Sequence, residues 1–206
     1  MIKNLLFDLG GVIMDIRKED CIRSYELLGL DDAASYFGEY SQTGVFMALE
    51  AGQIGPDEFH AELHRHLPAH VTDAQIDKAF CDFLTGIPAA RLAALRQLRR
   101  RFKVCLLSNT NPIMWDSKIA ECFRAEGRER EDYFDGMVTS FAARCLKPGR
   151  EIFDYAVRTL DLDPAETLFL DDSQANVEAA RALGFNAAVV PPGTEFTDII
   201  ARITTA

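Results

Sequence analysis

The sequence is short of cysteine and of positive charge, and each shortage excludes a class of protein. Its five cysteines are widely spaced and include no C-x-x-C pair, which favours reduced thiols over a disulfide framework or a zinc site. Lysine and arginine number 22 against 32 acidic residues, and the resulting net charge of -10 disfavours non-specific binding to nucleic acid. Anionic small substrates are not excluded, because a local lysine and a metal ion can reverse the field at a site.

Long apolar runs are also missing. No stretch approaches the ~20 apolar residues that a membrane span needs, and the first residues form an apolar strand after one lysine rather than a signal peptide. We therefore expect a cytoplasmic protein without a membrane partner. With 206 residues, 48% of them hydrophobic and 26% charged, the chain can form one large domain or a core with a smaller insertion.

Apolar runs rich in β-forming residues alternate with helical patterns over most of the chain, which predicts an α/β fold with a doubly wound, mostly parallel, Rossmann-like sheet. The predicted strands are residues 3–8, 103–108, 136–140, 167–171 and 186–190. The predicted helices between the later strands are Ala89–Arg101, Ile113–Arg124, Arg150–Leu160 and Asn176–Leu183.

The interval 15–85 interrupts this alternation. It has no convincing strand, and it carries helical patterns near Lys18–Leu28, Ala33–Phe46, Pro56–Leu67 and Asp73–Leu84. A helical unit inserted directly after the first strand would lie over the strand tips and cover a ligand site as a lid. We therefore predict a core of residues 1–14 and 86–206 and a helical cap of residues 15–85.

Most of the predicted strands end in polar residues that can do chemistry. These are Asp8, then Ser108 with Asn109, then Thr139 with Ser140, and finally Asp171 with Asp172. Ligands of such sheets bind beyond the carboxyl ends of the strands, so these residues should converge on one site.

The residue types at these ends suit an anionic substrate. The Asp8 carboxylate can act as a nucleophile, and the glycines that follow it permit a tight turn and a close approach to the main chain. Ser108 and Asn109 can donate hydrogen bonds to an anionic oxygen, and Lys147, before a proline, can neutralise both substrate and nucleophile. Adjacent carboxylates such as Asp171 and Asp172 favour a cation, and magnesium suits such ligands.

Together these segments resemble the haloacid dehalogenase-like hydrolase superfamily along the whole chain. The motifs are the nucleophile strand, an inserted helical cap, a serine-asparagine strand end, a lysine-proline turn and paired aspartates. In detail, Phe7-Asp8-Leu9-Gly10-Gly11-Val12, Leu107-Ser108-Asn109-Thr110-Asn111 and Leu170-Asp171-Asp172 look like the bacterial sugar-phosphate phosphatase branch, which includes an α-D-glucose-1-phosphate phosphatase.

The resemblance implies a role for each matching residue. Asp8 would be the nucleophile that forms an aspartyl phosphate, Ser108 and Asn109 would hold the phosphoryl group, and Lys147 would clamp it. Mg²⁺ would be bound by the Asp8 carboxylate, the Gly10 carbonyl and one of the paired aspartates. Asp172 is favoured for direct binding, because Asp172-Ser173 aligns with the more usual Gly-Asp-Ser form, and Asp171 would then act from a second shell or through water.

One position departs from the family pattern. Most phosphatases of the superfamily carry a second aspartate two residues after the nucleophile as general acid and base, and here that position is Gly10. Either the substrate has a good leaving group, such as an anomeric, acyl or aryl phosphate, or a cap side chain or water supplies the proton. Glu50 and His60 are candidates by sequence position.

The expected function is a magnesium-dependent phosphatase acting on a small-molecule phosphate ester, such as a sugar phosphate. Two alternatives remain open. A metal-free 2-haloacid dehalogenase also lacks the second aspartate, although it has no need for the pair Asp171-Asp172. A catalytically silent binding protein on the same fold is the other alternative. The sequence does not specify the substrate or the oligomeric state.

Overall fold

The computed structural model describes residues 1–38 and 42–204. Five parallel strands form the central sheet in the order β5-β4-β1-β6-β7, which places the N-terminal strand at its centre. Their bounds are β1 (Asn4–Phe7), β4 (Lys103–Ser108), β5 (Gly136–Thr139), β6 (Thr167–Asp171) and β7 (Asn186–Val189). The predicted parallel α/β sheet is confirmed, and each predicted strand is present within a residue or so of its predicted ends.

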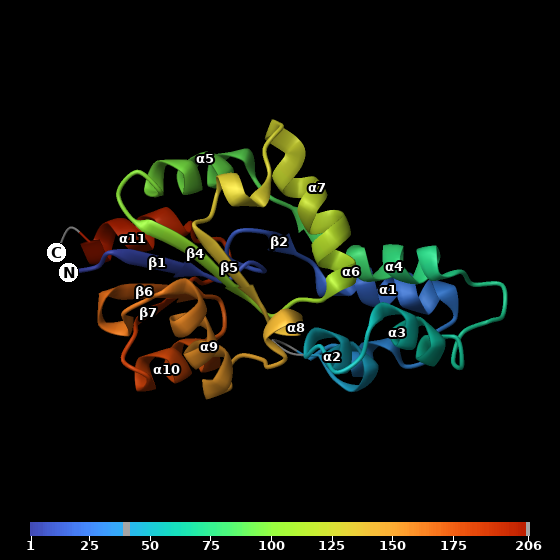
Figure 1. Ribbon diagram of the computed structural model, residues 1–206. Helices are drawn as coiled ribbons and strands as arrows, with labels where there is room; N and C mark the ends of the chain where they lie inside the picture. Colours follow the sequence, from blue (N-terminus) through green and yellow to red (C-terminus); the bar gives the residue numbers. More distant parts are fainter. Residues whose placement is uncertain (39–41, 205–206) are drawn as a thin grey trace.

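Helices cover both faces of this sheet (Figure 1). The helices outside the interval 15–85 are α5 (Ala89–Leu98), α6 (Pro112–Met114), α7 (Ala120–Phe123), α8 (Ser140–Ala143), α9 (Arg150–Leu160), α10 (Gln174–Ala182) and α11 (Phe196–Thr204). A π-helical segment, Trp115–Ile119, joins α6 to α7. Figure 1 shows α5 and α11 on one face of the sheet and α9 and α10 on the other.

Strand β1 is buried because both of its faces are covered. Leu5 and Phe7 belong to the hydrophobic cluster under α5 and α11, whereas Leu6 belongs to the cluster under α9 and α10. All three side chains are fully buried, and the Phe7 ring meets that of Phe196 edge to face, with 5.1 Å between centroids. Burial on both faces explains why this strand is uniformly apolar rather than alternating. Its rigid packing fixes the position of Asp8, the next residue.

The interval 15–85 is mainly helical, and its helices lie beyond the carboxyl ends of the strands (Figure 1). They are α1 (Lys18–Leu28), α2 (Gly44–Glu50), α3 (Pro56–Leu63) and α4 (Asp73–Cys81). Five rings pack together among them, with centroid separations of 4.8–6.4 Å: Tyr25, Phe37, Phe46, Phe59 and Phe80. The division into core and cap stays a prediction, which this separate aromatic cluster supports.

Two details of this interval differ from the sequence prediction. A short antiparallel ribbon of β2 (Asp15–Ile16) and β3 (Leu84–Gly86) joins its two ends, where no strand was predicted. The predicted helix Ala33–Phe46 is wrong as a single element: Ala33–Tyr36 is a 3₁₀ turn, and α2 begins only at Gly44, whose φ is +59°. Part of that prediction, residues 39–41, lies outside the described residues.

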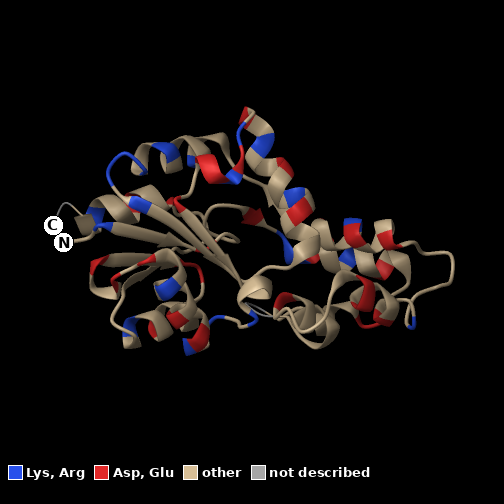
Figure 2. Cartoon of the chain, in the orientation of Figure 1, with Lys and Arg blue, Asp and Glu red and all other residues tan. Residues whose placement is uncertain are grey.

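Charged residues of both signs are spread over the helices and loops, and the strands carry few of them (Figure 2). The exceptions are at strand ends, including Lys103 at the start of β4 and Asp171 at the end of β6. Over the described ranges, no helix combines the length and the apolar character needed to cross a membrane.

Candidate active site

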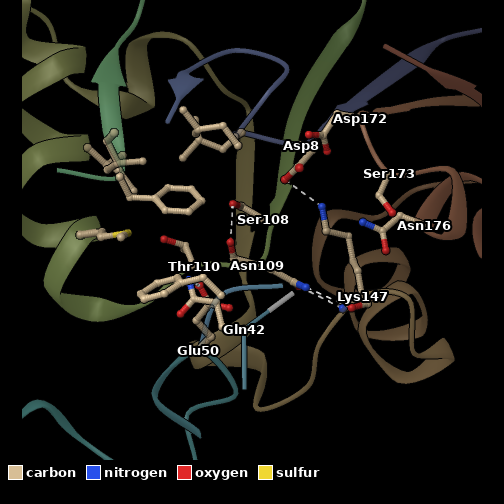
Figure 3. Close-up of a pocket in the computed structure, with 18 of the residues that line it drawn as sticks. Asp8, Gln42, Glu50, Ser108, Asn109, Thr110, Lys147, Asp172, Ser173 and Asn176 are labelled. Atoms are coloured by element: carbon tan, nitrogen blue, oxygen red, sulfur yellow. Dashed lines mark hydrogen bonds and ion pairs between the residues drawn. The ribbon is translucent and has the colours of Figure 1, made fainter. Parts of the chain in front are cut away.

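Of the four polar strand ends predicted to converge, three meet in one pocket of the described structure, whereas Thr139 and Ser140 at the end of β5 do not line it. Asp8 follows β1 and Ser108 ends β4, while Asp172 follows β6. The pocket has a volume of about 110 Å³. Figure 3 shows these side chains together with Lys147, which comes from the loop before α9. The strand order explains this convergence, because β4 and β6 are the two direct neighbours of β1.

Lys147 is the centre of a buried ion-pair network. Its Nζ lies 2.8 Å from Asp8 Oδ1 and 2.7 Å from Asp171 Oδ2, and its side chain is 1% exposed. Burial favours the neutral amine, but the attraction of Asp171 and Asp8 and their hydrogen bonds outweigh it, so the pKa of Lys147 lies above its usual value. The ammonium is therefore charged throughout the neutral range, and it touches the predicted nucleophile directly.

The two adjacent aspartates have different surroundings. Asp171 is fully buried, and its carboxylate oxygens accept hydrogen bonds from Lys147 Nζ, from the Ser173 backbone N–H at 2.9 Å and from Asn176 Nδ2 at 2.9 Å. Asp172 instead lines the pocket. The side chain of Asp171 is thus occupied by the protein, whereas that of Asp172 faces the space where a ligand would lie.

Three carboxylates and one ammonium leave the site with an excess of negative charge. One oxygen from each of Asp8, Asp171 and Asp172 lies within 4.8 Å of the others. Burial raises the pKa of Asp8 to about 8, against the opposing effect of Lys147 and with further increases from the other two carboxylates. Burial and the charge of Asp171 raise the pKa of Asp172 to about 6.

Such a cluster fits a divalent cation. Hard cations prefer carboxylate and carbonyl oxygens, and a double positive charge would offset the repulsion that disfavours ionised Asp8 and Asp172. Gly10 lines the same pocket and offers a backbone carbonyl. The residues present therefore suit magnesium by charge and by ligand type.

Gly11 shows how tightly this cluster is built. Its φ is +72°, and a Cβ placed on it would lie 2.2 Å from Asp172 Oδ2. A side chain at this position would both strain the backbone and displace the carboxylate. The requirement for glycine here comes from the approach of Asp172, a residue more than 150 positions away, and not only from the turn after β1.

Asn109 and Ser108 lie beside the nucleophile in different ways. The Asn109 side chain bonds to the backbone of Lys147 twice: Nδ2 donates to its carbonyl oxygen and Oδ1 accepts from its N–H, both at 3.0 Å. The Ser108 hydroxyl lines the pocket, with one long hydrogen bond of 3.4 Å to the Asn109 carbonyl. Asn109 therefore fixes the Lys147 loop, and its expected role in holding the phosphoryl group stays a prediction.

The far wall of the pocket comes from the helical interval. Of its polar residues, Gln42 was not predicted as part of the site, and Glu50 was named only from its position in the sequence. Gln42 and Glu50 lie there, each less than 10% exposed (Figure 3). His60 is not among the residues that line this pocket; its Nε2 lies 2.7 Å from Asp77 Oδ1, between α3 and α4. Of the two candidates named from sequence position for the missing acid, Glu50 alone reaches the site.

The rest of this wall is apolar. Its side chains come from the helical interval and from the segment that follows β4: Ile16, Phe37, Phe83, Leu84, Met114 and Ile119. Trp115, directly after Met114, packs against the Arg130 guanidinium, with 4.2 Å between Cζ and the ring centroid.

Comparison with known proteins places this geometry in a family context. A model of haloacid dehalogenase-like hydrolases matches residues 2–184. Among curated proteins, a D-ribitol-5-phosphate phosphatase of Bacteroides thetaiotaomicron is 36% identical over 185 residues, which are 90% of each chain.

Solved structures agree with this match. A mutant haloacid dehalogenase family enzyme of Bacteroides thetaiotaomicron, in complex with magnesium and inorganic phosphate, is 34% identical and superposes with a TM-score of 0.92 over 97% of this chain and 99% of that one. A predicted hydrolase of the same family from Porphyromonas gingivalis is 33% identical, with a TM-score of 0.92 over 100% and 99% of the two chains.

Proposed function

Because the chain belongs to the haloacid dehalogenase-like hydrolase family, we propose that it is a magnesium-dependent phosphatase that hydrolyses small phosphate monoesters through an aspartyl-phosphate intermediate. The observation that carries this proposal is the buried contact of Lys147 with Asp8 and Asp171, next to Asp172 in a pocket at the strand ends. The similarity to a D-ribitol-5-phosphate phosphatase supports it.

In the proposed reaction, a carboxylate oxygen of Asp8 attacks phosphorus in line with the ester bond, and that bond breaks to release the alcohol. Lys147 and the Ser108 hydroxyl stabilise the negative charge on the phosphoryl oxygens. Water then attacks phosphorus, inorganic phosphate leaves, and the Asp8 carboxylate is restored. Asn109 acts in both steps by holding the loop that carries Lys147.

Asp8, Asp172 and the Gly10 carbonyl would hold the magnesium ion. When bound, the ion supplies positive charge beside the phosphoryl oxygens and favours the ionised form of Asp8. Asp171 would not bind the ion directly, because its oxygens already accept hydrogen bonds from Lys147, Ser173 and Asn176. Its role is to hold Lys147 in place beside the site. This assignment keeps Asp172 as the direct ligand.

Candidate substrates fall into two kinds, according to whether the leaving oxygen needs a proton. Because Gly10 offers no acidic side chain, the segment that follows β1 favours an ester whose oxygen leaves without a proton, such as an aryl phosphate or a hexose 1-phosphate. The relative's substrate, D-ribitol 5-phosphate, is a primary alkyl ester whose oxygen needs a proton. We propose small sugar or polyol phosphates as the class, and direct comparison of the two kinds of ester tests it.

We expect magnesium-dependent release of phosphate from a panel of an aryl phosphate, hexose 1- and 6-phosphates and D-ribitol 5-phosphate. Chelation should abolish turnover, because the carboxylate cluster then carries uncompensated charge and Asp8 favours its protonated form. Adding 2-chloropropionate to the panel tests for 2-haloacid dehalogenase activity. Chloride release without metal, or full phosphatase activity in excess chelator, would contradict the proposal.

A second prediction concerns the cluster of carboxylates proposed to bind magnesium. Gly11→Ala should weaken magnesium binding measured by calorimetry, because the new Cβ collides with the Asp172 carboxylate. Placing alanine at a φ of +72° should also destabilise the fold by about 1–2 kcal/mol.

Gly55→Ala is the matched control. Gly55 precedes α3 with a φ of -93°, and a Cβ there meets nothing within 4 Å. This variant should bind magnesium as the wild type does. Equal magnesium affinity of Gly11→Ala and wild type would remove Asp172 from the proposed ligands.

A further inference from the structure

We propose that the carboxyl group of Glu50 gives the leaving oxygen its proton, and so performs the step for which Gly10 offers no side chain. This inference rests on the proposed phosphatase function and deepens it by naming a catalytic residue outside the strand ends. Its basis is the position of Glu50 in the pocket wall, the way its backbone is fixed, and the way one of its carboxyl oxygens is held.

Glu50 is the last residue of α2, and it lies across the pocket from Asp172 (Figure 3). The residue is only 8% exposed, although it carries a carboxyl group. Burying an acid costs free energy, so a buried glutamate in the same pocket as a candidate nucleophile is a functional candidate. An ester bound with its phosphorus at Asp8 would have its leaving group on the side of the pocket formed by this wall.

The backbone of Glu50 is fixed to the sheet end. The Ser140 hydroxyl, at the tip of β5, donates a hydrogen bond of 2.7 Å to the Glu50 carbonyl oxygen. Two residues later, a Cβ on Gly52 would lie 2.2 Å from the Phe141 carbonyl oxygen, so the turn after α2 packs directly against α8. The carboxyl group is therefore held relative to the strand tips, as a proton donor must be.

The side chain is oriented by Gln42. Gln42 Nε2 donates to Glu50 Oε1 at 2.8 Å, and this is the hydrogen bond that the described residues offer the carboxyl group. Gln42 Oε1 is buried and has no partner among the described residues. In the proposed complex, the other carboxyl oxygen, Glu50 Oε2, would face the leaving oxygen.

The charges around Glu50 favour the protonated form. Burial and, to a smaller extent, the Asp8 carboxylate raise the pKa of Glu50 to about 8 against the opposing effect of Lys147. The other charged residue of the pocket wall is Asp172. Helix α8, packed against α2, carries no charged residue, and Glu58 and Glu62 of α3 line a separate groove.

The proposed proton transfers balance over the two steps. In the first, the Asp8 oxygen bonds to phosphorus, the ester P–O bond breaks, and the Glu50 proton moves to the departing oxygen to give the alcohol. In the second, water bonds to phosphorus, both of its protons stay on the phosphate that forms, and the Glu50 carboxylate regains its proton from solvent. The acyl-phosphate P–O bond then breaks, and its electrons return to Asp8.

The test is Glu50→Gln, measured on two esters that differ in their need for an acid. Turnover of D-ribitol 5-phosphate, an alkyl ester, should fall by about 10²–10⁴-fold. Turnover of p-nitrophenyl phosphate should change little, because its leaving group departs as a stable anion. The fall in alkyl-ester kcat/KM of the wild type as pH rises through about 8, where Glu50 loses its proton, should vanish in the variant.

Two further variants separate chemistry from structure. Glu26→Gln removes an exposed carboxylate of α1 and should leave both activities unchanged. Gly10→Asp added to Glu50→Gln should restore alkyl-ester turnover, since a Cβ at Gly10 meets its nearest neighbour, Ile16 Cγ2, at 3.4 Å and the backbone φ is not positive.

Each other outcome overturns the inference. If Glu50→Gln slows both esters equally, Glu50 supports the pocket without transferring a proton. If it slows neither, the proton comes from elsewhere. Wild-type protein that hydrolyses no ester with magnesium would refute the proposed function itself. An active wild type whose Glu50→Gln variant is equally active would refute only the role of Glu50.

Discussion

Asp8→Asn is expected to lower phosphatase turnover by on the order of 10⁴–10⁶-fold, as the loss of a nucleophile does in other enzymes that form covalent intermediates. Asparagine keeps the size of the side chain but cannot form an acyl phosphate. The variant also removes one carboxylate from a cluster of three, so its effect on magnesium affinity should be measured separately from turnover. Single-turnover phosphate release from p-nitrophenyl phosphate gives the rate, because this ester does not depend on Glu50.

A second readout identifies the covalent step. Wild-type protein quenched in acid during turnover should yield a phosphorylated peptide that contains Asp8, and the Asp8→Asn protein should not. Asp31→Asn, at an exposed position before the turn Ala33–Tyr36, is the control and should keep both rate and intermediate. Wild-type turnover by Asp8→Asn would eliminate Asp8 as the nucleophile.

The sheet could be predicted because its strands are uniformly apolar and lie between amphipathic helices. Helix α1 begins and ends at the predicted residues, with Gly29 after it at a φ of +95°. The failures have physical reasons. The pattern Ala33–Phe46 is apolar enough for a helix, but its aromatic residues pack around Tyr25 from a turn and a second helix instead. Helix α11 was not predicted, although Phe196, Ile199 and Ile200 form its buried face.

The strand-end part of the site was predictable because a parallel sheet brings the carboxyl ends of neighbouring strands to one edge. The cap wall was not, because nothing in the local sequence shows that Ser140 donates to the Glu50 carbonyl or that Gly52 packs on Phe141. The same holds for Asn109, whose amide suggests ligand binding but bonds to the Lys147 backbone. Contacts between distant segments decide these roles, and a single sequence does not record them.

Lys147→Met should be the most destabilising substitution in the site. The Lys147 ammonium balances two carboxylates that are almost fully buried, with side-chain exposures of 12% for Asp8 and 0% for Asp171. Removing one partner of a buried ion pair typically costs about 3–5 kcal/mol, because the remaining charges lose their compensation without regaining water. Urea unfolding in chelator measures this loss apart from any metal effect, and phosphatase turnover should fall with it.

The loss should depend on pH, and its sign follows from the carboxyl groups that remain. Without Lys147 the main influence that lowers the pKa of Asp8 is gone, and burial raises that pKa further above its value in the unfolded chain. A buried carboxyl of this kind destabilises the fold while ionised, and it stops doing so as pH falls and it takes up a proton. Because Asp8 of the wild type already takes up its proton near pH 8, the stability deficit of Lys147→Met should shrink as pH falls toward about 8 and change little below that value.

Lys78→Met separates this effect from the loss of any lysine. Lys78 of α4 pairs with Asp82, the residue after this helix, but the Lys78 side chain is 75% exposed, so its removal should cost less than about 1 kcal/mol with little change over the same pH range. A Lys147→Met deficit that is equally small, or that grows as pH falls, would mean that Asp8 and Asp171 are compensated by something other than this ammonium. Another group would then have to compensate these two carboxylates, on which both the proposed metal site and the nucleophile depend.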